Sequence, residues 1–133
     1  MSVRPAPDSP EAWLERSRSD LQVARIVLGV PGVVLEDACF HAQQCAEKAL
    51  KALLLERNLR VPRTHVLETL LDLLKSSGLV LPIAVDQAYF LTEYAVQTRY
   101  PGVRLDVTRP EAEQAIEAAN QVLRWVEMQI VRH

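Results

Sequence analysis

The segment 111–133, EAEQAIEAANQVLRWVEMQIVRH, shows the clearest periodicity in the chain. Its apolar residues recur at the three- and four-residue spacing that places side chains on one face of an α-helix. These residues are Ala112, Ala115, Ile116, Ala119, Val122, Leu123, Val126 and Ile130. Thr108 and Glu111 have the spacing of a capping box, in which each side chain accepts a hydrogen bond from the other residue's backbone N–H. The segment therefore predicts a long amphipathic helix with a defined start.

The rest of the chain divides into similar windows, because its eight prolines and four glycines fall between them. Working back from the last helix, the other windows are 83–100, 64–77, 33–61 and 11–28. Proline inside a helix costs about 3 kcal/mol and glycine about 1 kcal/mol, so these residues mark the turns between helices. Ser9, which precedes Pro10, is placed to cap the first window, and Thr64 is placed to cap the third.

These windows predict an all-α protein, an up-and-down antiparallel helical bundle with four main helices plus a shorter one. We expect one domain over residues 1–133, with residues 1–8 flexible. The alternating run 103–107 has no second strand to pair with and is expected to be an extended loop. No stretch reaches the roughly 18 consecutive apolar residues that a membrane span requires, so we expect no membrane association and a cytoplasmic protein.

Composition and motifs exclude several functional classes. The hydrophobic fraction of 49% and charged fraction of 24% are typical of a globular protein, and the formal net charge of −2 argues against attraction of the whole surface to nucleic acid. Cys39 and Cys45 lie six positions apart on a predicted helix and cannot form a disulfide with each other. We expect neither a metal site nor a cofactor. Metal-independent RNA cleavage remains open, because it needs only a cation for the phosphate and a general acid or base.

Arginines gather in two of the predicted loops. Short connections make consecutive helices antiparallel, so the loops after the second and fourth windows should lie at the same end of the bundle. A guanidinium suits phosphate, and helix N-termini capped by Thr64 and Thr108 would add positive dipole ends there. We therefore expect one anion-binding pole for nucleotide or RNA phosphates; the alternative is that the arginines only offset helix dipoles. The residues are Arg57, Arg60, Arg63, Arg99, Arg104 and Arg109.

The second window has one side of small apolar residues and one polar side. The small residues, which allow a neighbouring helix to approach closely, are Ala38, Ala42, Cys45, Ala49 and Ala52. The polar residues are His41, Gln44, Glu47, Lys48 and Lys51. This polar side is either a solvated surface or a functional groove in which His41 and Lys48 contact phosphate or a partner. Roughly 25 Å of axial rise is expected between His41 and the loop that carries His65, too far for one shared site.

The fourth window has two apolar faces. Val85, Tyr89, Thr92 and Val96 form one face, and Ile83, Phe90 and Tyr94 form a second, nearly opposite face. Such a helix needs two neighbours. Either both faces are internal, or the aromatic face that includes Phe90 and Tyr94 is the interface of a homodimer.

Three segments together carry a family resemblance. They are HAQQCAEKALKALL at 41–54, PRTH at 62–65 and TRYPG at 98–102. In this combination the chain resembles the HEPN domain family (higher eukaryotes and prokaryotes nucleotide-binding) over nearly its whole length. The resemblance implies a helical bundle that dimerises and is often encoded beside a small nucleotidyltransferase. Such a pair acts as a toxin–antitoxin or nucleotide-handling system.

Many relatives in this family are metal-independent ribonucleases, and their signature is an arginine, four to six residues and a histidine near the last helix. Counted from Arg99, the required positions 104–106 hold no histidine. Arg60 and His65 match the spacing, but they lie in the loop between the second and third windows, where we interpret the match as accidental. Arg99 and Tyr100 are the residues that the resemblance implies as the remnant of the family's polar site.

Three functions remain open on these grounds. The first is a homodimeric module that binds nucleotide, RNA or a nucleotidyltransferase partner without chemistry. The second is a ribonuclease in which His65 or Tyr100 replaces the missing histidine, although a tyrosine with a pKa near 10 is a weak base at neutral pH. The third is a purely structural dimerisation domain.

Overall fold

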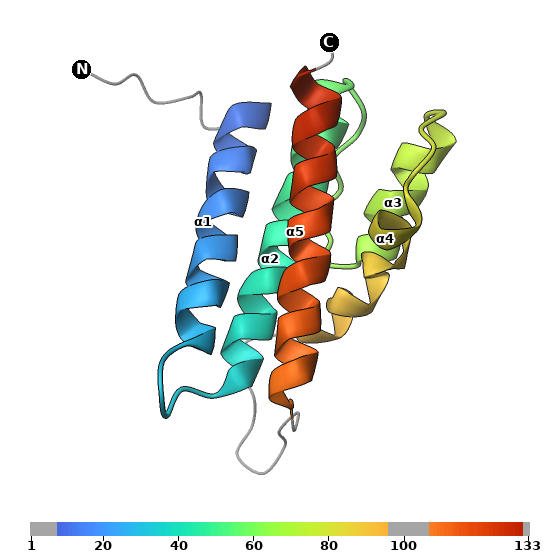
Figure 1. Ribbon diagram of the computed structural model, residues 1–133. Coiled ribbons are helices and arrows are strands. Elements are labelled where there is room, and N and C mark those ends of the chain that lie inside the picture. Colours follow the sequence, from blue (N-terminus) through green and yellow to red (C-terminus); the bar gives the residue numbers. More distant parts are fainter. Residues whose placement is uncertain (1–7, 96–106, 132–133) are drawn as a thin grey trace, which may run out of the picture.

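The computed structural model describes residues 8–95 and 107–131, and these residues form an all-helical bundle (Figure 1). Its elements are α1 (Pro10–Leu28), α2 (Leu35–Glu56), α3 (Leu67–Ser76), α4 (Ile83–Asp86), the 3₁₀ helix η1 (Gln87–Tyr94) and α5 (Arg109–Val131). The predicted all-α bundle is confirmed, and none of the described residues forms a strand. In the same ranges no helix has the length and hydropathy needed to cross a membrane.

Some of the predictions concern residues outside the described ranges. They are the flexibility of residues 1–7, the 96–100 end of the fourth window, most of the extended loop 103–107, and the candidate residues Arg99, Tyr100 and Arg104.

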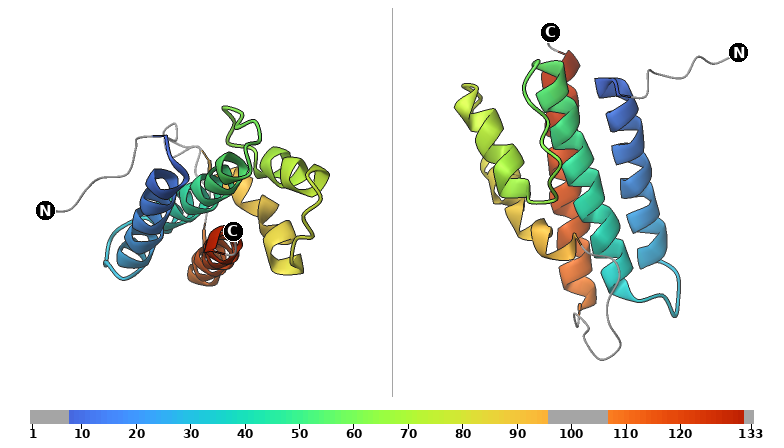
Figure 2. Two further views of the ribbon diagram at one scale, coloured as in Figure 1. Left: turned by 90° about the horizontal axis from the view of Figure 1, so that it is seen from above. Right: turned by 180° about the vertical axis from the view of Figure 1, so that it is seen from behind.

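Helix α2 lies at the centre of the bundle, where it packs against α1, α5, α3 and η1 (Figure 2). Ala42, Ala46 and Ala49 are fully buried, which lets the neighbouring backbones approach closely. On the α1 side, Ser17 Oγ donates a hydrogen bond of 2.7 Å to the backbone oxygen of Cys45. The small-residue side predicted for this helix is thus the core of the fold.

Both predicted N-terminal caps of the long outer helices are confirmed. The side chain of Ser9 accepts a hydrogen bond from the backbone N–H of Ala12, and Pro10 begins α1. At the start of α5, Glu111 N donates to Thr108 Oγ1 at 3.3 Å and Thr108 N donates to Glu111 Oε1 at 3.2 Å. These caps use residues three positions apart, so local sequence is enough to predict them.

The start of α3 differs from the prediction. Thr64 Oγ1 accepts from Val66 N within a tight turn, and the helix begins only at Leu67. The first backbone donor of the helix, Leu67 N, bonds instead to Thr92 Oγ1 at 3.0 Å. The prediction that Thr64 caps this helix is therefore wrong, because Thr92, 25 residues after Leu67, supplies the acceptor.

The fourth window forms one α-turn followed by a 3₁₀ helix, rather than a long α-helix. Its buried residues recur every three positions, which is the period of a 3₁₀ helix. They are Val85, Ala88, Leu91 and Tyr94. Tyr94 is only 4% exposed and belongs to the core, whereas Phe90 is 39% exposed. The predicted aromatic face that joins Phe90 with Tyr94 is therefore wrong, since the shorter period separates the two rings.

The connection 57–66 does not make a short antiparallel turn. It runs back along α2, so that α3 starts beside the middle of α2 and points in the same direction (Figures 1 and 2). The backbone oxygen of His65 accepts a hydrogen bond from Gln43 Nε2 at 3.3 Å, which fixes this path. As a result, the C-terminal end of α2 and the N-terminal end of α5 lie at opposite ends of the bundle.

Candidate functional site

A polar network is buried between α2 and the returning segment 57–66. Its centre is the carboxylate of Glu47, whose side chain is 5% exposed. Gln43 and Lys51 lie four residues before and after Glu47, which places all three on one helical face. Gln43 Nε2 donates to Glu47 Oε1 at 3.0 Å, and Lys51 Nζ donates to Glu47 Oε2 at 2.9 Å. The buried ammonium of Lys51 is therefore neutralised within the fold.

His65 joins this network from the loop. Its Nδ1 lies 2.9 Å from Glu47 Oε1, and its side chain is 66% exposed. An ionised carboxylate is an acceptor only, so Nδ1 donates the proton and Nε2 is left as the ring nitrogen available for other partners. The buried carboxylate therefore fixes both the tautomer and the orientation of an exposed imidazole.

The protonation of Glu47 is set by two opposing effects. Burial raises the pKa of its carboxyl, but hydrogen bonds from Lys51, Gln43 and His65 outweigh burial and leave the pKa below the ordinary value of 4.5. The carboxylate therefore stays ionised near neutral pH and remains an acceptor for His65.

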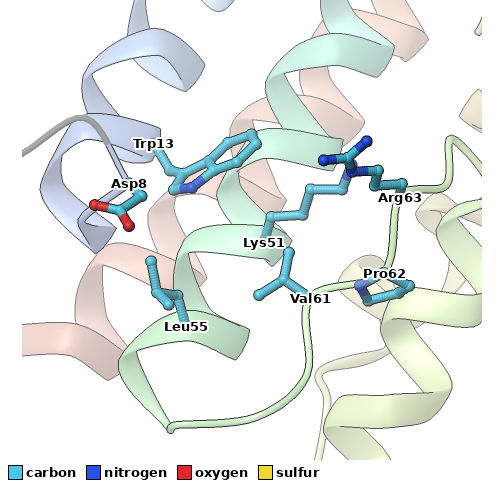
Figure 3. Close-up of a pocket in the computed structure, with 7 residues that line it drawn as sticks. All are labelled: Asp8, Trp13, Lys51, Leu55, Val61, Pro62 and Arg63. Atoms are coloured by element: carbon cyan, nitrogen blue, oxygen red, sulfur yellow. The ribbon is translucent and has the colours of Figure 1, made fainter.

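Beside this network, a pocket of about 320 Å³ opens between α1, α2 and the loop (Figure 3). It is lined by Asp8, Trp13, Lys51, Leu55, Val61, Pro62 and Arg63. Figure 3 shows Trp13 on one side of the pocket and the apolar side chains of Leu55, Val61 and Pro62 on the other. Lys51 Nζ lies 5.7 Å from the centroid of the Trp13 ring, within the range of a cation–π contact. The pocket thus combines an aromatic wall, an aliphatic wall and charged groups.

Two charged side chains at this pocket form no ion pair with any residue that the structure describes. Within residues 8–95 and 107–131, neither Asp8 nor Arg63 takes part in an ion pair, and both side chains belong to exposed residues. In Figure 3 they lie on opposite sides of the Trp13 indole. The pocket therefore presents one cation and one anion at separate positions, neither of them ion-paired within the described ranges.

The polar side of α2 is packed rather than solvated. Asp20 of α1 accepts from Lys48 Nζ at 2.6 Å through one carboxylate oxygen, and its other oxygen lies 3.0 Å from His41 Nδ1. Gln44 Nε2 donates to Gln43 Oε1, and Lys51 is only 7% exposed. The solvated-surface interpretation is therefore wrong for this side, because α1 and the loop cover it. Asp20 engages both His41 and Lys48 within the fold, and the groove interpretation stays a prediction.

The expected separation of His41 from His65 is also wrong. Gln43 lies two positions after His41 on α2, and its side chain reaches the backbone oxygen of His65. The expected distance required a loop that extends beyond the end of α2, whereas the loop folds back along the helix. Each histidine nevertheless contacts a different carboxylate: His41 contacts Asp20, and His65 contacts Glu47.

The described arginines do not share one pole. Arg57 lies where α2 ends, Arg60 is exposed in the loop, and Arg63 lines the pocket. Arg109 lies at the other end of the bundle, where its Nη1 donates to the backbone oxygen of Leu28 at 3.0 Å. The prediction of one arginine pole is therefore wrong for these four residues. Segment 57–66 runs back along α2, so the end of α2 and the start of α5 lie at opposite ends of the bundle instead of at the same end.

Sequence patterns alone missed three residues of this region. Trp13 flanks the apolar stripe of α1, and Asp8 precedes the cap of the same helix. The sequence pattern puts Glu47 on the polar side of α2 but predicts no role for it. A usable signal existed for Glu47, because glutamine, glutamate and lysine recur every four residues at 43, 47 and 51. No sequence signal connects Trp13 or Asp8 with a loop some fifty residues away.

In the parts of the chain that the structure describes, no three His, Cys, Asp or Glu side chains come together as metal ligands would. Glu47–His65 and Asp20–His41 are pairs, and each pair also contacts a lysine.

Comparisons with known proteins agree with this architecture. The model of the HEPN domain matches residues 10–129. The crystal structure of ST0689, an archaeal HEPN homologue, is 32% identical with a TM-score of 0.72, and the match covers 92% of this chain and 98% of that one. The crystal structure of TT1696 from Thermus thermophilus is 35% identical with a TM-score of 0.75, covering 91% and 98%. No protein with a curated function shows significant similarity. The chain belongs to the HEPN domain family.

Proposed function

We propose that this HEPN protein binds the phosphate of a nucleotide or of RNA in the pocket between α1, α2 and segment 57–66. The observation that carries this proposal is the guanidinium of Arg63, which lines the pocket and has no ion pair within the described ranges. A guanidinium donates paired hydrogen bonds to phosphate, and charge-assisted bonds of this kind are among the strongest in proteins. A volume of about 320 Å³ is at the lower limit for ligand pockets and suits one nucleotide.

Calorimetric titration with ribose phosphate and with a short single-stranded RNA tests this proposal. Arg63→Gln should weaken both affinities about tenfold or more, because a charge-assisted hydrogen bond is lost. Arg124→Gln is the matched control, since Arg124 is exposed on α5, which contributes no residue to the pocket. Equal affinities of the Arg63 variant and the wild type would refute the site. Arg99 and Tyr100, outside the described residues, remain candidates from the family resemblance.

A ribonuclease is the second candidate, and the contact between His65 and Glu47 favours it. A buried carboxylate that orients an exposed imidazole is suited to general acid–base catalysis, and Arg63 would supply the cation for the phosphate. Incubating the pure protein with cellular RNA in EDTA should then release fragments, and His65→Gln should abolish the cleavage. Intact RNA in the wild-type reaction would exclude this candidate.

For assembly, we propose a homodimer that uses the exposed apolar side chains of α4 and η1. Ile83, Tyr89 and Phe90 are 75%, 50% and 39% exposed. Exposed apolar groups of this kind are typical of protein interfaces. Phe90→Glu should convert a dimer to a monomer in sedimentation experiments, whereas Met128→Glu, an exposed position on α5, should not. A wild-type monomer, or a dimer unaffected by Phe90→Glu, would contradict this interface.

We also propose that the protein has a nucleotidyltransferase partner and acts with it as a toxin–antitoxin pair. We expect this pair to act in the cytoplasm. Their support is the resemblance to paired members of the family. The adjacent reading frame gives the test, because a nucleotidyltransferase encoded there should copurify with this chain and reverse any growth defect that the chain causes alone. If the protein binds no nucleotide, RNA or partner, a structural dimerisation domain becomes the better description.

A further inference from the structure

The pocket offers separate places for the parts of a nucleotide. Trp13 on α1 faces the aliphatic side chains of Leu55 and Val61 across the pocket (Figure 3). A flat base fits between an aromatic and an aliphatic wall, since stacking on an aromatic side chain stabilises every nucleobase. Arg63 stands on one side of the indole, where its guanidinium can donate hydrogen bonds to a phosphate. This leaves Asp8, on the opposite side, to meet the far edge of the base.

Asp8 lines the pocket, and an ionised carboxylate only accepts hydrogen bonds, so a base that presents donors suits this position best. Guanine presents two adjacent donors on its pairing edge, a ring N–H and an exocyclic amino group, which match the two carboxylate oxygens. Adenine and cytosine place a ring acceptor beside their amino group. Uracil places a carbonyl on each side of its single N–H. Only guanine therefore offers a paired donor edge without a repulsive neighbour.

We propose that the pocket binds one guanosine monophosphate unit, with its base between Trp13 and the aliphatic wall, its donor edge at Asp8 and its phosphate at Arg63. This inference rests on the proposed function, since it takes the phosphate at Arg63 as given, and it adds the identity of the base. The unit has two sources, a free nucleotide or the terminal guanosine of an RNA chain. Both sources present the same base, ribose and phosphate.

Calorimetric titration of the full chain with guanosine, adenosine and uridine monophosphates and with ribose phosphate tests the base. The guanosine nucleotide should bind about tenfold more tightly than the uridine nucleotide. Asp8→Asn should remove this preference and leave the affinity for ribose phosphate unchanged. Asp8 is exposed, so this variant tests the site even if Trp13→Leu fails to fold. A folded Trp13→Leu protein should lose affinity for all three nucleotides but not for ribose phosphate.

The outcomes separate this inference from the proposed function. Equal binding of all four ligands, with loss on Arg63→Gln, would overturn the guanine assignment and preserve the phosphate site. Absence of binding for every phosphate ligand would overturn both. A short RNA that starts with a phosphorylated guanosine distinguishes the sources. Tighter binding than the free nucleotide identifies an RNA end as the ligand, and equal or weaker binding identifies the free nucleotide.

Discussion

The Nδ1 atom of His65 lies 2.9 Å from the carboxylate of Glu47, a residue 18 positions earlier in the chain. This contact holds segment 57–66 against α2, together with the hydrogen bond from Gln43 to the backbone of His65. It also decides where the loop's arginines lie. Arg63 is brought to a pocket beside Trp13, while Arg109 is left at the far end of the bundle.

Replacing the central carboxylate should give a pH-dependent loss of stability. Glu47→Gln leaves the buried ammonium of Lys51 without a counter-charge, so the free energy of unfolding should fall by about 3 kcal/mol near neutral pH. The pKa of Glu47 is lowered by the fold, so its stabilisation is present above the ordinary value of 4.5 and is lost as pH falls through the folded value. In urea unfolding, the difference in the free energy of unfolding between Glu47→Gln and wild type should therefore become smaller as the pH falls below 4.5. A difference that stays constant into acid would contradict the role of this carboxylate.

Loss of the imidazole should loosen the loop. His65→Ala removes the contact with Glu47, so limited trypsin digestion should cut more rapidly after the loop arginines Arg60 and Arg63. Thr69→Ala is a suitable control, because Thr69 is exposed on α3, outside this network. Equal cleavage rates in the two variants would mean that the histidine does not hold the segment.

The distant cap of α3 predicts a difference between two threonines. Thr92→Val removes the acceptor for Leu67 N and should destabilise the protein by about 1 kcal/mol. Thr64→Val removes only the acceptor of an exposed turn and should have a smaller effect on urea unfolding. A larger loss of stability from Thr64→Val than from Thr92→Val would mean that Thr64, not Thr92, caps α3.

Both cysteines should be unreactive in the folded protein. Burial raises the pKa of Cys39 to about 11 and that of Cys45 to about 12, so almost no thiolate is present at mildly alkaline pH. An aromatic disulfide reagent should modify neither thiol in buffer and both thiols in guanidinium chloride. Rapid modification of the native protein would show that the core opens far more readily than the fold implies.

The small-residue side of α2 should tolerate little added volume. Ala49 is fully buried, and Ala49→Leu should reduce the free energy of unfolding by about 1–3 kcal/mol because neighbouring helices must move apart. Gln114→Leu places a leucine at an exposed position of α5, outside the proposed dimer interface, and should be nearly neutral. Similar urea midpoints for the two variants would indicate that α2 is not tightly packed.

The two long outer helices and their N-terminal caps can be predicted from the local sequence. Helices α1 and α5 follow from apolar periodicity, and their caps use residues within three positions of each other. The sequence predicts one helix where the structure has α4 and η1, because other apolar residues such as Tyr89 and Phe90 mask the three-residue period of the core side chains. Tertiary contacts decide between such periods, and one sequence does not display them.

The candidate site was predictable only in parts. The sequence predicts Arg63 and His65 as candidates in one loop and Lys51 as a candidate on a helix face apart from that loop, because short connections are expected between all helices. The return of segment 57–66 depends on contacts with Glu47 and Gln43, which lie far away in sequence. Trp13 of α1 shares a pocket with this loop because the loop returns along α2.

The most direct test of the phosphate site is NMR chemical-shift mapping with ribose phosphate added to the isotope-labelled protein. We expect the largest changes at the side chain of Arg63, the indole N–H of Trp13 and the backbone of segment 57–66. Changes centred on Arg109 at the opposite end of the bundle, or no change at saturating ligand, would contradict it.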